Sequence, residues 1–320
     1  MNAAVVHSFS APPRYDTFAE PVPSGEEVLV TVAAAGLHPI VKSLAAGSHY
    51  SSTSELPFVP GLDGVGRLPD GLRVYFARSR PLYGTFAERS LTQRATCFPI
   101  PENLSDATVA AIMNPGMSSW GALTERTHFA PGESILILGA TGVAGQLAVQ
   151  VAKRLGARRV VAAGRNPLAL EELRALGADG LISLAQERAS LVATFRDAMA
   201  EEKIDLVLDY LWGAPAEAVL EAMTQKGGSH GAARVRFVQV GSSAGPAVSL
   251  SAESLRSSGL EVMGSGLGSV PIERIFRSLA LFLQEAAREP FQIRTTVAPL
   301  AQVESLWNTP EPGARIVLQP

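Results

Sequence analysis

The segment LILGATGVAGQLAVQVAKRLGA, residues 136–157, constrains the fold more than any other part of the chain. A short apolar run ends in a turn where Gly139, Gly142 and Gly145 recur every third position, and a helical pattern with one apolar face follows. Glycines in this order allow a tight turn, the close approach of a pyrophosphate, and packing of helix on strand. We therefore predict a strand over 134–138, a helix that Gly156 ends, and a dinucleotide phosphate at the helix N-terminus.

The rest of the chain surrounds this motif with two different patterns. Residues 1 to about 118 contain short apolar runs separated by Gly and Pro, which predicts a mostly β region. After residue 133, short apolar runs alternate with helical stretches, which is typical of βαβ units and a buried parallel sheet. Residues 269–287 predict a further amphipathic helix, and 294–300 and 314–320 predict strands. From the residues alone, this tail either extends the α/β region or returns to the N-terminal one.

Composition excludes several classes of protein. With 320 residues, 47% of them hydrophobic and 18% charged, the chain can bury about two cores. The net charge of −3 and the absence of a basic run argue against nucleic acid as a partner. We see no signal peptide and no apolar stretch long enough for a membrane span, so we expect a cytoplasmic protein. The single cysteine, Cys97, excludes an intramolecular disulfide and a cysteine-rich zinc site.

The pattern Gly-Ala-Thr-Gly-x-x-Gly also occurs in short-chain dehydrogenases. In that class the motif normally opens the chain, and many members carry a Tyr-x-x-x-Lys pair for proton transfer. Here the motif begins at Gly139, and none of the five tyrosines has a lysine four residues later. These two departures disfavour the short-chain class.

A collinear series of motifs resembles the medium-chain dehydrogenase/reductase superfamily, in its zinc-free quinone oxidoreductase-like branch. The motifs are AAAGLHPIVKSLAAGSHY, PFVPGLDGVG, GTFAERS, AAIMNPGMSSWGAL, ILGATGVAGQLAVQVAKRLGA, LGADGLISL, DLVLDYL and RFVQVGSSAG. The resemblance implies an α/β fold: a Rossmann doubly wound parallel sheet plus a mostly β GroES-like substrate domain. It places the substrate domain at 1–118, the NADP(H)-binding domain at 119–265, and a C-terminal segment at 266–320 that returns to the substrate domain. It also implies a homodimer through the cofactor domains.

The positions where zinc-dependent members of this superfamily carry their ligands hold other residues here. His38 and Pro39 stand where those members have a cysteine, and Leu62 and Asp63 stand where they have a His-Glu pair. A catalytic zinc needs about three protein ligands. His38, Asp63 and a third group could in principle supply them, but we expect no metal.

The end of the second predicted parallel strand indicates which nicotinamide cofactor the chain uses. NAD-binding sites usually place an acidic residue there, on the adenosine ribose. This chain has Gly164, Arg165 and Asn166 instead, and an arginine can bind a 2′-phosphate through two hydrogen bonds. We therefore predict NADPH. The full set of cofactor-binding residues that we predict is Gly139, Thr141, Gly142, Val143, Gly145, Gly164, Arg165, Asn166, Gly241, Ser242 and Ser243.

Three residues are candidates for the chemistry. Tyr50 lies close to the position of a substrate-cleft tyrosine in the resembling family, and His38 stands where that family usually has an asparagine. Asn114 falls at the predicted hinge between the domains, where its amide could bond cofactor or substrate. Each could instead be a structural loop or turn residue.

The sequence as a whole predicts a zinc-independent, NADPH-dependent oxidoreductase. Its substrate would be a small quinone or α,β-unsaturated carbonyl compound, because hydride transfer to an electrophilic carbon asks for positioning and hydrogen bonds rather than a Lewis acid. The alternatives are a zinc-independent alcohol dehydrogenase and a nucleotide-binding sensor or structural protein with little turnover.

Overall fold

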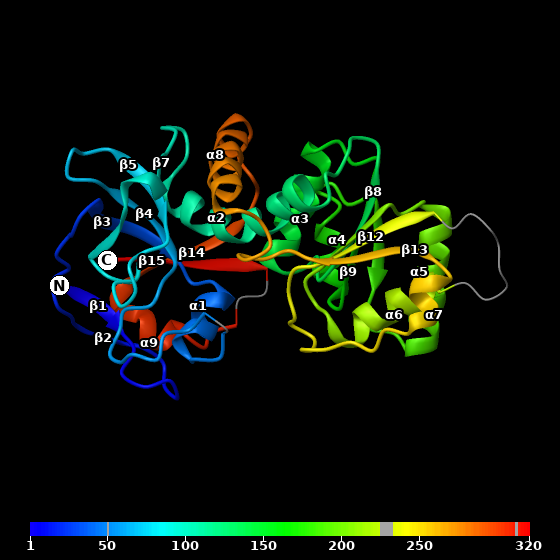
Figure 1. Ribbon diagram of the computed structural model, residues 1–320, viewed down its shortest axis with the longest axis horizontal. Coiled ribbons are helices and arrows are strands. Elements are labelled where there is room, and N and C mark those ends of the chain that lie inside the picture. Colours follow the sequence, from blue (N-terminus) through cyan, green and yellow to red (C-terminus); the bar gives the residue numbers. More distant parts are fainter. Residues whose placement is uncertain (50, 225–232, 311–312) are drawn as a thin grey trace. The chain divides into compact units, whose positions relative to one another are not determined.

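The computed structural model describes residues 1–49, 51–224, 233–310 and 313–320. The chain forms two compact units (Figure 1). The first consists of residues 1–115 with 279–320, and the second of residues 116–278. The chain passes from one unit to the other within α2 (Asp106–Gly121) and again within α8 (Ile272–Arg288).

The second unit, residues 116–278, is built on a six-stranded parallel sheet, so the predicted fold class is confirmed for this part. In spatial order the strands are β10 (Gly180–Ser183), β9 (Arg159–Gly164), β8 (Ser134–Leu138), β11 (Leu206–Asp209), β12 (Arg234–Gln239) and β13 (Gly259–Gly264). The connecting helices are α3 (Val143–Arg154), α4 (Pro167–Glu172), α5 (Arg188–Glu201), α6 (Gly213–Met223) and α7 (Ala252–Arg256). Figure 1 shows α3 on one face of the sheet and α5 and α6 on the other.

The central strand β8 explains why this sheet is buried on both sides. All five residues of SILIL are buried. Leu136 and Leu138 face a cluster that contains Phe195 of α5 and Val219 of α6. Because side chains alternate along a strand, Ile135 and Ile137 face the opposite side, which helix α3 covers. The continuous apolar run is therefore the pattern expected of a parallel strand with helices on both faces.

The first unit holds a seven-stranded sheet in the order β14-β15-β3-β4-β5-β7, with β6 also paired to β3. Its strands are β3 (Glu27–Gly36), β4 (Asp63–Arg67), β5 (Arg73–Ala77), β6 (Arg89–Gln93), β7 (Cys97–Pro99), β14 (Arg294–Pro299) and β15 (Ala314–Gln319). A two-stranded sheet of β1 (Asn2–Val5) and β2 (Arg14–Thr17) and the helices α1 (Pro39–Ala45) and α9 (Val303–Leu306) complete it. The C-terminal strands thus pair with an N-terminal strand, since β15 is antiparallel to β3.

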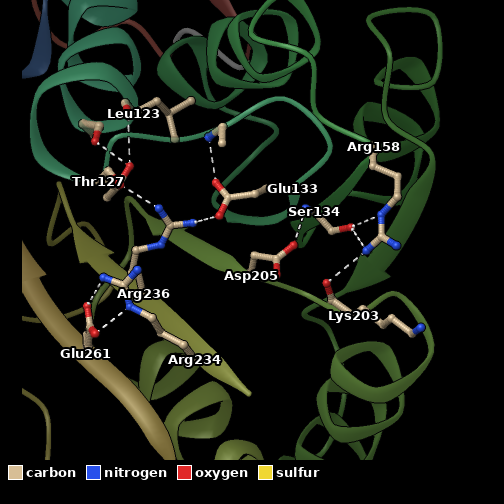
Figure 2. A network of polar contacts seen from close by, with 12 residues as sticks. Leu123, Thr127, Glu133, Ser134, Arg158, Lys203, Asp205, Arg234, Arg236 and Glu261 are labelled. Atoms are coloured by element: carbon tan, nitrogen blue, oxygen red, sulfur yellow. Dashed lines mark hydrogen bonds and ion pairs between the residues drawn. The ribbon is translucent and has the colours of Figure 1, made fainter.

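A polar network joins the amino ends of the strands in the second unit (Figure 2). Arg236 of β12 is buried and donates to the carbonyl of Thr127 at 2.6 Å, while its other nitrogen pairs with Glu133. Thr127 ends a π-helix over Ala122–Arg126, and its N–H bonds the carbonyl of Ala122. Arg236 therefore fixes the end of an irregular helix whose carbonyl has no helical partner.

Among the helices that the structure describes, none combines the length and the apolar character needed to cross a bilayer.

Two arginines on β12 allow a matched test of burial. Arg236→Met leaves Glu133 without its buried cation and should lower the free energy of unfolding by about 3–5 kcal/mol. Arg234 pairs with Glu261 in the same network, but its side chain is 66% exposed. Arg234→Met should therefore cost much less stability than Arg236→Met. Urea unfolding of both variants measures the difference, and equal losses would contradict this account.

Candidate functional site

The glycine turn after β8 packs closely against the start of α3. Gly139 has a φ of +81°, a conformation that a residue with a Cβ adopts only under strain. A Cβ at Gly145 would lie 2.4 Å from the carbonyl oxygen of Gly139. The first turn of α3 thus rests directly on the backbone of the preceding turn, and this packing needs glycine at both positions.

The N-terminus of α3 has no side-chain cap. Gly142 is the N-cap residue and has no side chain to cap the helix. A Cβ there would meet only the oxygen of Gly139, at 3.5 Å. The side chain of Gln146 donates to the carbonyl of Thr141, which holds the loop from within. The first N–H groups of a helix lack partners inside the helix, so a phosphate that binds here meets donors and the positive end of the dipole.

The end of β9 contributes a second group of residues beside this turn. The position of a Cβ on Gly164 is only 2.6 Å from Cγ2 of Thr141, so the absence of a side chain lets the two loops pack together. The oxygen Oδ1 of Asn166 caps α4 by accepting from the N–H groups of Leu168 and Ala169. Arg165 is exposed, and the described residues give it no ion-pair partner.

The turn after β11 forms the next part of the same sheet edge, and Asp209 organises it. Its carboxylate accepts from the N–H of Leu211 at 2.8 Å and from that of Trp212 at 3.1 Å. Burial raises the pKa of Asp209 to about 6, while these two backbone donors act in the opposite direction. Tyr210 and Leu211 lie against the Cβ position of Gly139. The sequence shows only an Asp at the end of a buried strand, and nothing in it predicts the importance of this turn.

The loop after β12 packs on the turn after β11. A Cβ on Gly241 would lie 2.7 Å from the carbonyl oxygen of Tyr210, and the hydroxyl of Ser243 donates to that same oxygen at 3.1 Å. Ser242 is exposed. Burial raises the pKa of the Tyr210 phenol to about 12, and its hydroxyl lies 3.0 Å from that of Ser118. The Tyr210 hydroxyl is therefore neutral at physiological pH.

These loops lie at the carboxyl ends of neighbouring strands around a topological switch point. From β8 the chain moves to β9 and β10, then returns to β11 on the other side of β8. Open α/β sheets bind their ligands at such a point. The structure therefore brings the predicted cofactor-binding residues of the second unit to one sheet edge, with a geometry suited to a dinucleotide.

In the first unit, a buried polar cluster forms around Asp63, the first residue of β4. Its Oδ1 accepts from Nδ2 of Asn114 at 3.3 Å, and its Oδ2 accepts from the hydroxyl of Tyr75 at 3.1 Å. Nε2 of His38 lies 3.8 Å from the same Oδ2. Two of the three predicted chemical residues, His38 and Asn114, are thus brought together. The sequence indicates Asp63 only as a possible metal ligand, and nothing in it singles out Tyr75.

Tyr50, the third predicted chemical residue, lies outside the described residues. Within the described ranges, no three His, Cys, Asp or Glu side chains group in a way that could hold a metal ion. Burial and the charge of Asp63, together with their hydrogen bond, raise the pKa of Tyr75 well above its usual value. Tyr75 is therefore a hydrogen-bond donor to the carboxylate at all physiological pH values.

Comparison with known proteins agrees with this geometry. Residues 143–284 match a family model described as zinc-binding dehydrogenase. The probable NADPH-dependent quinone reductase tdiC of Emericella nidulans is 29% identical, over 100% of both chains. The quinone oxidoreductase of Sus scrofa is 27% identical, over 95% of this chain and 91% of its own. The crystal structure of the quinone oxidoreductase from Thermus thermophilus, studied also with NADPH, has a TM-score of 0.80 and 26% identity, with 100% of both chains covered.

These comparisons support the medium-chain dehydrogenase/reductase superfamily, and within it the quinone oxidoreductase-like branch, as the motifs predicted. The family model that names zinc covers neither His38 nor Asp63, because its match begins at Val143. The resemblance therefore does not decide whether this protein binds a metal.

The raised pKa of Asp209 gives a pH-dependent prediction. Below its unfolded pKa of 3.8 the carboxyl is protonated in both states, and above about 6 the folded state holds a buried charge. Asp209→Asn should therefore leave stability nearly unchanged at pH 4 and raise it by up to about 3 kcal/mol at pH 7. Urea unfolding across this range measures the effect.

Asp179 provides the control, because its pKa is shifted in the opposite direction from that of Asp209. Burial alone would raise its pKa, but hydrogen bonds from Lys153 and from the N–H of Val160 hold the pKa below its usual value. Asp179→Asn should therefore destabilise the protein at pH 7. For Asp209, a difference in the free energy of unfolding between wild type and Asp209→Asn that does not change with pH would contradict the raised pKa.

Proposed function

We propose that this protein is a zinc-independent, NADPH-dependent oxidoreductase that transfers hydride to a quinone or to an α,β-unsaturated carbonyl compound. The observation that carries the proposal is the three-glycine turn at the switch point, with exposed Arg165 at the end of the neighbouring strand. The names of the relatives in Emericella nidulans and Sus scrofa support the reaction class.

In this proposal the unit of residues 116–278 binds the cofactor and the other unit binds the substrate. The first N–H groups of α3 hold the pyrophosphate, and Gly145 keeps the helix close enough to do so. Arg165 binds the 2′-phosphate through its guanidinium, and the amide nitrogen of Asn166 adds a donor. Gly241, Ser242 and Ser243 line the nicotinamide or ribose end. Bound NADPH supplies the hydride.

The substrate side needs hydrogen-bond donors rather than a metal. When hydride adds to the electrophilic carbon, negative charge develops on the carbonyl oxygen and a proton must follow. Asn114, His38 and Tyr50 are the residues that we propose for this oxygen. We propose the absence of a metal from the groups around His38 and Asp63. Their neighbours in the cluster are the amide of Asn114 and the phenol of Tyr75, and neither an amide nor a phenol is a usual zinc ligand.

The proposed partners are a small-molecule acceptor and a second copy of the chain. The homodimer would form through the cofactor units, as the family resemblance implies. An exposed strand edge supports this, because β13 is the outermost strand of the six-stranded sheet and its Val262 is 38% exposed.

Turnover and metal dependence can be measured together. Purified protein treated with a chelator should oxidise NADPH in the presence of quinones or enones at the same rate as untreated protein, because no step in the proposal uses a metal. The measurement is NADPH absorbance against a panel of acceptors, with elemental analysis for zinc. Bound zinc with activity lost on its removal would contradict the zinc-free assignment, whereas NADPH binding without turnover would favour a sensor or structural role.

The choice of NADPH over NADH should depend on Arg165. Arg165→Ala removes the charged partner of the 2′-phosphate and should weaken NADPH binding about 10-fold or more while leaving NADH binding nearly unchanged. Calorimetric dissociation constants for both cofactors measure this. Arg174 is a matched control, because it is half-exposed and pairs with Glu171 on the surface. Equal affinities in the wild type, or a preference that Arg165→Ala retains, would show that Arg165 is not the discriminating residue.

A further inference from the structure

We propose that Asp63 is a positioning residue that fixes the side-chain amide of Asn114 for hydride transfer; this inference rests on the proposed function above. Asp63 is 3% exposed and Tyr75 is 2% exposed, whereas Asn114 is only partly buried. A ligand can therefore reach Asn114, while Asp63 acts from behind it. The substrate feature that Asn114 would recognise is the carbonyl oxygen of the acceptor.

The chemistry of a carboxylate decides which way the amide faces. An ionised carboxylate only accepts hydrogen bonds, so the nitrogen end of the Asn114 amide must face Oδ1 of Asp63. The second N–H and the carbonyl of this amide are then directed away from Asp63. An acceptor carbonyl oxygen can take a hydrogen bond only from such an N–H. One orientation of the amide is therefore productive, and Asp63 selects it.

The carboxylate is itself held in one place by its neighbours. Tyr75 donates to Oδ2, and the hydroxyl of Thr85 donates to the backbone carbonyl of Asp63 at 2.9 Å. The Nε2 atom of His38 lies 3.8 Å from the same Oδ2, and a Cβ on Gly36 would come within 2.6 Å of the Cε1 and Nε2 atoms of this ring. Glycine at position 36 thus makes room for the imidazole beside Asp63. Side chains from β5, from α2 and from the residue before α1 thus meet at one carboxylate, and Thr85 holds its backbone, which is the arrangement that positioning requires.

Asparagine at position 63 would keep the size and shape of the side chain but would no longer select one orientation of the Asn114 amide. The Tyr75 hydroxyl can donate or accept, so the oxygen and the nitrogen of the new amide can exchange places. Either end of the Asn114 amide could then face residue 63. Asp63→Asn should therefore fold, while Asn114 loses its single orientation.

A double-mutant cycle tests whether Asp63 acts through Asn114. Asp63→Asn should lower kcat about 10-fold, with little change in the KM for NADPH, and Asn114→Ala should lower kcat about 100-fold. In the Asn114→Ala background, Asp63→Asn should change kcat less than about twofold. Asp106→Asn is the control. Asp106 lies on α2, the same helix as Asn114, and its substitution breaks an ion pair with Arg73 but removes no contact of Asp63. It should leave kcat unchanged.

A second readout does not depend on turnover. The side-chain amide resonances of Asn114, identified by their loss in Asn114→Ala, should be a single set in the wild type and should shift or split in Asp63→Asn. Independent, multiplicative losses of kcat in the cycle, or an Asn114 amide that Asp63→Asn does not affect, would overturn the positioning role. If the wild type reduces quinones or enones and the two losses of kcat multiply, the positioning role is rejected and the proposed function stands. If the wild type shows no turnover, the proposed function is rejected, and the amide resonances of Asn114 then decide whether Asp63 orients this amide.

Discussion

The contact between Gly139 and Gly145 is the constraint on which the second unit depends. With a Cβ position at Gly145 only 2.4 Å from the oxygen of Gly139, helix α3 can begin directly above the end of β8 only if that Cβ is missing. This contact sets the direction of α3, and thereby the direction of its first N–H groups. Gly164, Leu211 and Tyr210 then pack around the same turn. A methyl group at position 145 would move the helix terminus away from all of them.

The two edges of the parallel sheet differ in how their polar groups are used. At the amino edge, side chains pair with one another and with backbone groups: Arg236 pairs with Glu133 and donates to the carbonyl of Thr127, and Asp205 accepts from the N–H of Ser134 at 2.8 Å (Figure 2). At the carboxyl edge, glycines and short loops leave backbone donors and exposed Arg165. Charge pairing makes the first edge rigid, and unpaired donors make the second edge suited to a phosphate.

The sequence predicted what local spacing encodes and missed what long-range packing creates. The run SILIL and the apolar stripe after Gly142 identified β8 and α3, because strand and helix periodicities are properties of consecutive residues. The glycine turn and the end of β9 were found in the same way. The cluster around Asp63 was not, because Asn114 and Tyr75 reach it from α2 and β5, and no spacing along the chain reports that convergence. Gly164 was predicted only as a cofactor-binding residue, and its close packing on Thr141, where a Cβ would lie 2.6 Å from Cγ2, is again a long-range contact that spacing does not report.

Two buried aspartates in the two units show why burial alone does not assign a role. Among the described residues, the Asp209 carboxylate bonds only backbone N–H groups, whose positions the turn between β11 and α6 fixes, so it shapes the backbone. Asp63 bonds the side chains of Asn114 and Tyr75, and side-chain amides can rotate. A carboxylate that faces fixed donors can only hold the shape of a turn, whereas one that faces a rotatable amide selects among its orientations. This difference in partners, rather than the depth of burial, is why we propose a positioning role for Asp63 and none for Asp209.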